Sequence, residues 1–162
     1  MARRVVLHLA LLGVGLAGFR LAVVPAEVCP AVSAAQVAGA ADEAAAWLVR
    51  NLGDDGRYLY GFDRDADEVS GQYNGTRHAG VTMSLYQYAA AAGRPEAIVA
   101  ADRGLAFMLE HLVGGPGWEA WRPPGEDVQL GANALLTAAL VMRRRATAAP
   151  THDGTMRAAG RV

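Results

Sequence analysis

The chain has 162 residues, with 15 Lys and Arg against 16 Asp and Glu and a formal net charge of -1. This length fits one domain, and the near-neutral balance gives no electrostatic basis for binding nucleic acid or an anionic membrane surface. The sequence contains no Cys/His spacing of a metal site, no glycine loop for phosphates and no Ser-centred nucleophile motif. We therefore expect no metal and no cofactor.

Residues 1–34 have the organisation of a secretory signal peptide. Arg3 and Arg4 supply a positive start, Val5–Phe19 is apolar apart from one histidine, and Ala31-Val32-Ser33-Ala34 has the small residues of a cleavage site. The apolar run is shorter than the roughly 20 residues that span a bilayer. We therefore predict cleavage at this segment and a secreted or periplasmic protein. The alternative is an uncleaved segment that anchors the chain in a membrane.

Cys29 is the only cysteine, and it falls inside this signal region. After cleavage the mature chain would therefore contain no thiol and no disulfide. We expect contact with a membrane only through an uncleaved N-terminal segment.

Four main helices are predicted after the signal segment. Apolar residues recur at helical spacing over 35–52, 79–92, 95–112 and 131–145. Glycine-rich and proline-containing turns separate these segments. The predicted fold class is all-α, with an α/α-hairpin domain over 35–145. Residues 146–162 show no apolar period, and we expect an irregular, disordered tail there.

The predicted helices repeat. Trp47–Gly53 matches Phe107–Gly114 in residue type, with one inserted residue, and each is followed by a glycine-rich turn and an aromatic segment. A long loop then leads to Gly80 in one unit and to Gly131 in the next, 51 residues later (131 − 80). A two-helix unit of roughly 50 residues is typical of stacked or toroidal helical hairpins.

Four segments resemble the α/α-toroid proteins, which include the six-hairpin glycosidase-like and the terpenoid-cyclase-like barrels. They are Asp55-Gly56-Arg57-Tyr58, Tyr73–Gly80, the hairpin through His111, and Leu130–Leu135. The resemblance implies the helical hairpins of an incomplete α/α toroid, its N-terminal part, because a full ring has more hairpins than this chain can form. It also implies that the loops before the inner helices carry the substrate-binding groups.

By that resemblance, Tyr73, Asn74, Arg77 and His78 would bind a substrate at the mouth of a cavity, and Asn133 would do so in the next repeat. Arginine can hold a carboxylate, histidine can transfer protons near neutral pH, and Tyr and Asn can hydrogen-bond sugar hydroxyls. The structural alternative is that Asn74 caps the helix, Arg77 pairs with the acidic loop before it, and His78 is a buried, hydrogen-bonded imidazole.

Asp63, Asp65 and Glu119 are the candidates for a catalytic acid and base, since glycosidases place two carboxylates across the scissile bond. The alternative for the first two is a solvated acidic turn. A calcium loop is disfavoured because Glu68 stands where such a loop needs glycine. Tyr58 and Trp118 are candidates for stacking on a sugar ring, and the alternative is packing over the helix ends.

The resemblance thus predicts an exported protein that binds or processes carbohydrate, as a fragment of a toroid, with a glycan or a small polar molecule as its ligand. Two alternatives have a different function: a non-enzymatic helical binding or scaffold module, and a terpenoid-cyclase-like fragment. A small complete helical domain is the alternative to a fragment, because four amphipathic helices can bury a core.

Overall fold

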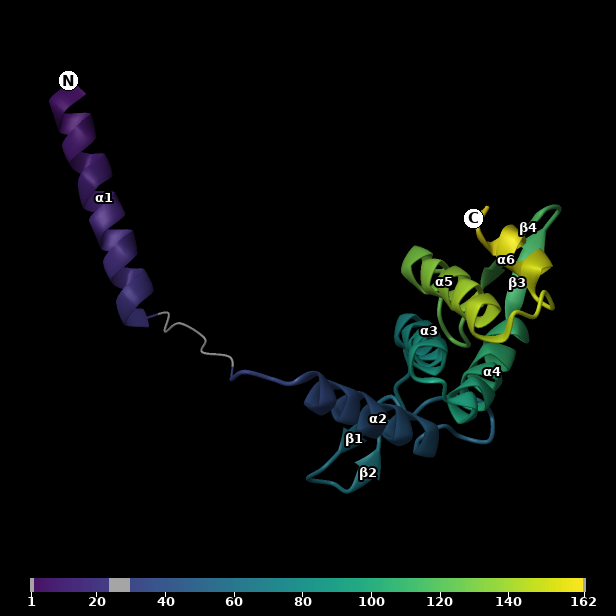
Figure 1. Ribbon diagram of the computed structural model, residues 1–162. Coiled ribbons are helices and arrows are strands. Elements are labelled where there is room, and N and C mark those ends of the chain that lie inside the picture. The colour runs from purple at the N-terminus through teal and green to yellow at the C-terminus, as the bar shows by residue number, and fades with distance from the viewer. Residues whose placement is uncertain (1, 24–29, 162) are drawn as a thin grey trace. The chain divides into compact units, whose positions relative to one another are not determined.

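The computed structural model describes residues 2–23 and 30–161 (Figure 1). The chain divides into two compact units, Met1–Ala34 and Ala35–Val162. The described residues are mostly helical, which confirms the all-α class. Cys29 lies outside the described residues, so the prediction that the mature chain contains no thiol stays a prediction.

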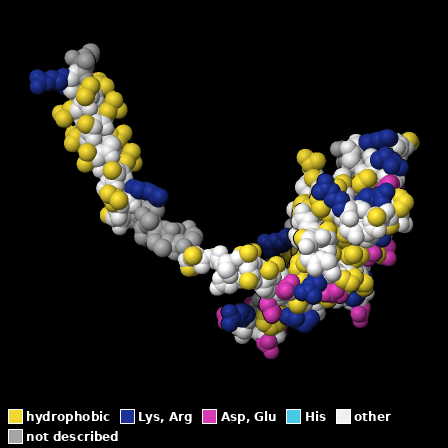
Figure 2. Space-filling model, viewed as in Figure 1, with side chains coloured by type: hydrophobic (Ala, Val, Ile, Leu, Met, Phe, Trp, Pro, Cys, Tyr) yellow, Lys and Arg dark blue, Asp and Glu magenta, His cyan; other side chains and the backbone are white. Residues whose placement is uncertain are grey.

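The helix of the first unit, α1 (Ala2–Val23), is 22 residues long. Figure 2 shows hydrophobic side chains along its visible length and basic side chains near its two ends. By length and composition, Arg3–Ala22 could cross a membrane, since a helix of 20 residues rises about 30 Å. The candidate span is therefore longer than the apolar run Val5–Phe19, because the helix continues through Arg20. Signal sequences and membrane anchors share these properties.

The second unit contains helices and two short hairpins. The helices are α2 (Ala34–Arg50), α3 (Gly75–Ala92), α4 (Pro95–Leu109), α5 (Leu130–Thr147) and α6 (Asp153–Ala159). Antiparallel pairs join β1 (Phe62–Asp63) to β2 (Glu68–Val69) and β3 (Leu112–Gly115) to β4 (Trp118–Trp121). The four predicted helices correspond to α2–α5. The start predicted for the second of them is wrong by four residues, because the chain already turns helical after Asn74.

The central helix of the second unit is α3, which packs against both α4 and α5 (Figure 1). Its buried residues recur every three to four positions and form one face. They include Ala79, Thr82, Leu85, Tyr86 and Ala89. Several of the facing positions are small, and small residues let helices approach closely. They include Ala97, Ala100, Ala101, Gly104, Ala132 and Ala139.

The helices α3 and α5 run parallel to each other. At their N-terminal ends, the Thr76 hydroxyl donates to the Gln129 side-chain oxygen at 3.1 Å. In their C-terminal halves, Tyr86 and Arg143 both bond to Asp102 of α4, at 2.5 and 2.8 Å. The two parallel helices are therefore joined directly where they begin and through α4 in their C-terminal halves.

The structural repeat spans 55 residues (130 − 75), from the start of α3 to the start of α5, and both helices contain 18 residues. Both end at a left-handed residue, Gly93 with φ 64° and Ala148 with φ 57°. The predicted correspondence of Gly80 with Gly131 is therefore wrong by about one helical turn. Gly80 lies inside α3, since the caps and the buried face rather than the glycines set the register.

The predicted irregular tail is also wrong, because residues 153–159 form α6, which packs against α5 and β4. Pro150 lies 55 residues after Pro95, and the buried Ala159 lies 55 residues after the buried Gly104. The tail thus repeats the first part of α4. Its sequence carries no helical period of its own, and tertiary packing stabilises such a short helix.

Candidate ligand-binding site

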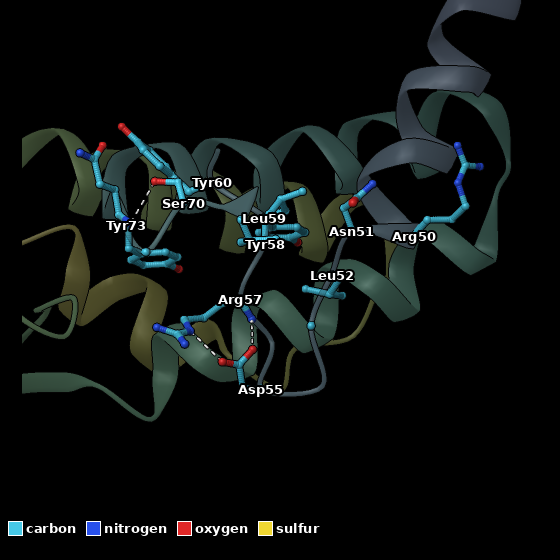
Figure 3. Close-up of a pocket in the computed structure, with 14 residues that line it drawn as sticks. Arg50, Asn51, Leu52, Asp55, Arg57, Tyr58, Leu59, Tyr60, Ser70 and Tyr73 are labelled. Carbon is cyan, nitrogen blue, oxygen red and sulfur yellow. Dashed lines mark hydrogen bonds and ion pairs between the residues drawn. The ribbon is translucent and has the colours of Figure 1, made fainter. Parts of the chain in front are cut away.

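Two cavities share the segment Tyr58-Leu59-Tyr60 as part of their lining. The larger measures about 560 Å³ and lies between the turn after α2 and the chain leading into α3 (Figure 3). The smaller measures about 190 Å³ and is lined by α2, by the same segment and by the first turns of α3. Tyr58, Leu59, Tyr60 and Tyr73 line both cavities, so we treat the two as one candidate site.

The turn after α2 is shaped by backbone contacts. Leu52 forms an isolated antiparallel bridge with Tyr58, and the Gly53 N–H donates to the Arg57 carbonyl at 2.8 Å. Gly56 has φ 81°, and a Cβ there would lie 2.7 Å from the Arg103 carbonyl oxygen of α4. Glycine therefore allows the turn to lie against α4. As a result Tyr58 is buried and Arg57 is exposed.

His78 lies on α3, and its ring is almost fully buried. Its Nε2 donates to the Gly104 carbonyl at 2.8 Å, and its Nδ1 accepts from the Tyr73 hydroxyl. Four rings surround it, with centroids 5.0 to 5.8 Å away: Tyr58, Tyr73, Phe107 and Trp121. Burial lowers the pKa of His78 to about 4, so the imidazole is neutral near pH 7. This environment matches the buried, hydrogen-bonded alternative.

Tyr58 and Tyr73 are neutral as well. Burial raises the pKa of Tyr58 to about 12 and raises the pKa of Tyr73 further. The Tyr58 and Thr82 hydroxyls share a hydrogen bond of 3.3 Å, and Thr82 donates to the His78 carbonyl at 3.1 Å. The floor of the site is thus an uncharged network whose polar atoms are already paired.

Asn74 and Arg77 mark the entrance to α3. The Asn74 side chain accepts from the Arg77 N–H at 2.9 Å, so Asn74 is the N-cap, as the structural alternative predicted. The Arg77 guanidinium lies over the Tyr60 ring, 4.8 Å from its centroid. In the part of the chain that the structure describes, Arg77 forms no ion pair with the acidic loop, so that expected pairing is wrong.

Two predicted substrate-binding residues lie elsewhere. The Asn133 amide is buried, and it donates to the carbonyls of Trp121 and Gln129 while accepting from the Trp121 N–H at 2.7 Å. The Asn133 amide group therefore bonds to the backbone of β4 and α5 and holds them together. Trp118 lies on the β3–β4 hairpin, 41% exposed, and lines neither cavity. The site therefore contains Tyr58, Tyr73, Asn74, Arg77 and His78 but neither of these two.

The three predicted catalytic carboxylates line neither cavity. Asp63 accepts from the N–H groups of Ala66 and Asp65, at 3.0 and 2.9 Å, and these bonds hold its pKa below the usual value. Asp63 and Asp65 thus belong to the exposed β1–β2 turn, which matches the solvated acidic alternative. Glu119 lies on β4. The structure therefore does not assemble these carboxylates into an acid–base pair at the site.

Several lining residues were missed by the reasoning from sequence. They are Trp47, Leu48, Arg50, Asn51, Arg57, Leu59, Ser70, Gln72 and Val81. The aromatic and basic run around Tyr58 was the available signal, since Arg57 and Tyr60 flank it. The others come from α2, from the chain after β2 and from α3, and no local pattern links these segments.

Asp55 is the only carboxylate that lines either cavity among the described residues. It accepts from Arg57 Nε at 2.7 Å, and hydrogen bonds from Arg57, first of all from its backbone N–H, lower the pKa of Asp55. The described residues also contain no cluster of His, Cys, Asp and Glu that could hold a metal ion. The chemistry of the site therefore rests on aromatic rings, amides and guanidinium groups.

Comparison of the chain with family models, with curated proteins and with solved structures found no match. The functional proposal therefore depends on the residues that line the two cavities.

Proposed function

We propose that the second unit binds a glycan or a similar small polar molecule in the site around Tyr58–Tyr60. The observation that carries the proposal is that Tyr58, Tyr73, Asn74, Arg77 and His78 line one cavity together with two further aromatic residues. Aromatic faces stack on the apolar faces of sugar rings, while amide and guanidinium groups hydrogen-bond the hydroxyls. The site therefore combines the two kinds of contact that recognise a sugar.

The arrangement of helices supports a relation to the α/α toroids. Consecutive hairpins in such rings place parallel inner helices side by side, with the outer helices between them in sequence. The parallel pair α3 and α5, bridged by α4 and repeated at 55 residues, agrees with two such hairpins. We propose the incomplete-toroid interpretation on this basis, and α6 occupies the place in the repeat that α4 has in the unit before it.

We also propose that the protein is exported. α1 has the length and apolar character of a signal sequence or anchor. The segment 30–33 that precedes α2 is non-helical and exposed, as segments open to proteolysis commonly are. Export would place the binding site where free glycans occur.

Binding is favoured over hydrolysis as the activity. Acid–base catalysis needs two groups within reach of the substrate, with one carboxyl protonated near neutral pH. The lone carboxylate at the site, Asp55, is paired with Arg57 and has a lowered pKa. His78 is neutral, and both of its ring nitrogens are engaged.

The test is calorimetric titration of the full-length chain, in mild detergent, with a panel of oligosaccharides. We expect saturable binding that Tyr60→Ala weakens by about fivefold or more, because one stacked ring contributes roughly 1 kcal/mol. Trp118→Ala is the matched control, since that exposed aromatic residue lies outside the cavities. Absence of binding by the folded chain, or equal weakening by both substitutions, would refute the proposal.

A second candidate function, a scaffold module, is favoured by α2. Val37, Ala41 and Ala44 lie on the apolar face that the sequence predicts, and yet all three are exposed. An exposed apolar stripe on a helix is a feature of protein-binding surfaces. Replacing Val37 by Asp would abolish capture of a protein partner and leave glycan binding unchanged.

A further inference from the structure

We propose that the ligand of this site is anionic, specifically a sugar that bears a carboxylate, such as a uronic acid. This inference rests on the proposed function and narrows it. Three arginines, Arg50, Arg57 and Arg77, line the two cavities, against the single carboxylate of Asp55. The chain as a whole has a net charge of -1, so the positive balance is a local property of the site.

Two of the three arginines lie over tyrosine rings of the site. Arg77 lies 4.8 Å from the centroid of Tyr60, and Arg57 lies 5.6 Å from the centroid of Tyr73. Stacking uses the face of the guanidinium, whereas a carboxylate is bound by the N–H groups at its edge. Both tyrosines line both cavities, so these guanidinium groups are positioned at the site by its own walls.

The existing partners do not satisfy this positive charge. Arg57 uses its Nε on Asp55, and Arg50 and Arg77 have no ion pair among the described residues. The acidic side chains of the β1–β2 turn, from Asp63 to Glu68, line neither cavity. Since the guanidinium groups of a half-exposed site remain hydrated, a carboxylate can replace water there at low desolvation cost.

Aromatic walls then select a sugar over a simple anion. A free carboxylate has no ring to stack on Tyr60 or Trp47, so it gains only the exposed ion pair, which is weak. A uronic acid engages the aromatic faces with its ring and a guanidinium with its carboxylate. The combined site therefore predicts both a preference for charge and a requirement for the sugar.

The experiment compares a uronic acid trisaccharide with the neutral trisaccharide obtained by reducing its carboxylates to alcohols. We expect the acidic form to bind about tenfold or more tightly at low salt, with the advantage falling as salt rises. Arg77→Gln should reduce this preference, because it should weaken binding of the acidic form more than binding of the neutral form, which loses only a hydroxyl contact. Arg157→Gln, which changes an exposed arginine of α6 outside the cavities, is the matched control.

Arg77→Lys separates charge from stacking geometry, and it should retain only part of the preference because lysine cannot bind a carboxylate at two points. Equal affinity for the two trisaccharides, or equal loss of both in Arg77→Gln, would overturn the inference and leave glycan binding intact. Binding of neither trisaccharide by the folded chain would refute the proposed function as well. Near-ultraviolet circular dichroism identifies any variant that fails to fold.

Discussion

The two repeats have the same helical frame but differ in what fills the space beside it. In the second repeat, β4 lies over the start of α5 and buries Trp121 completely. In the first repeat, the corresponding segment at Tyr58 has only an isolated bridge to Leu52 and lines both cavities of the candidate site. The loop between the helices, rather than the helices, therefore distinguishes the repeats, and we call the second, with its paired hairpin, closed and the first open.

The same difference appears at one helix position. His78 and Asn133 each lie four residues after the N-cap, and both are buried and polar. The Asn133 amide bonds to β4 of its own repeat, whereas the His78 ring reaches across to α4. The closed repeat holds its hairpin through this position, and the open repeat uses it to join neighbouring helices. The predictions below test that contrast.

The largest effect is expected from Trp121→Ala, which removes the ring that closes the second repeat. Loss of a fully buried tryptophan should lower the free energy of unfolding by about 3 to 5 kcal/mol. Denaturant unfolding of the chain measures this change. Trp121→Phe is the control, since it keeps a ring and removes an indole N–H that has no hydrogen-bond partner among the described residues. A loss in the phenylalanine variant as large as in the alanine variant would contradict the packing argument.

Acid should destabilise the first repeat through His78. Because burial lowers its pKa from 6.5 to about 4, the stability it contributes is complete above pH 6.5 and is lost as pH falls towards 4. This contribution of His78 to the free energy of unfolding is about 3 kcal/mol. Unfolding curves at pH 7 and pH 4.5 measure the loss, which His78→Asn should largely remove. His152 also has a lowered pKa, so His152→Asn tests the remainder. An unchanged pH dependence in His78→Asn would exclude this origin.

Gly104→Ala should destabilise the contact between the open repeat and α4. A Cβ at this position would lie 2.4 Å from the Tyr58 hydroxyl oxygen and 2.8 Å from Thr82 Oγ1. Overpacking of this kind costs about 1 to 3 kcal/mol in the free energy of unfolding. Ala159 occupies the equivalent position in the next repeat, so the reverse substitution can be made there. Ala159→Gly should lower the free energy of unfolding by about 1 kcal/mol or less. Thermal unfolding of both variants checks the pair, and a neutral Gly104→Ala would contradict the close approach.

The smallest effect is expected at the helix start. Asn74→Ala removes the side-chain cap of α3 and should cost about 1 kcal/mol. Gln129, the N-cap of α5, makes no side-chain cap bond, so Gln129→Asn should gain stability if the asparagine can cap. That gain is reduced by the lost bonds to Thr76 and Glu126. Differential scanning calorimetry resolves both changes, and an unaffected Asn74→Ala would show that the cap contributes little.

Local signals predicted the helices well and the site in part. The periodicity of α2–α5 and the Asn74 cap depend on residues within one or two turns, which the sequence displays directly. Five predicted binding residues lie in one cavity because four of them fall within the short segment from Tyr73 to His78 and the fifth, Tyr58, packs on His78. Asn133 was assigned by its place in the predicted repeat, and Trp118 and the three carboxylates by residue type. Neither criterion reveals which partners a fold supplies.

The amino-acid sequence by itself determined the apolar N-terminal helix, the all-α class and the existence of a two-helix repeat. These follow from hydrophobic spacing and turn residues, which act over short distances. Only the tertiary structure decided the 55-residue register, the folding of residues 153–159 into α6 and the joining of the turn after α2 to the start of α3 in one site. Those outcomes depend on contacts between distant segments, where burial and cross-chain hydrogen bonds outweigh local propensity.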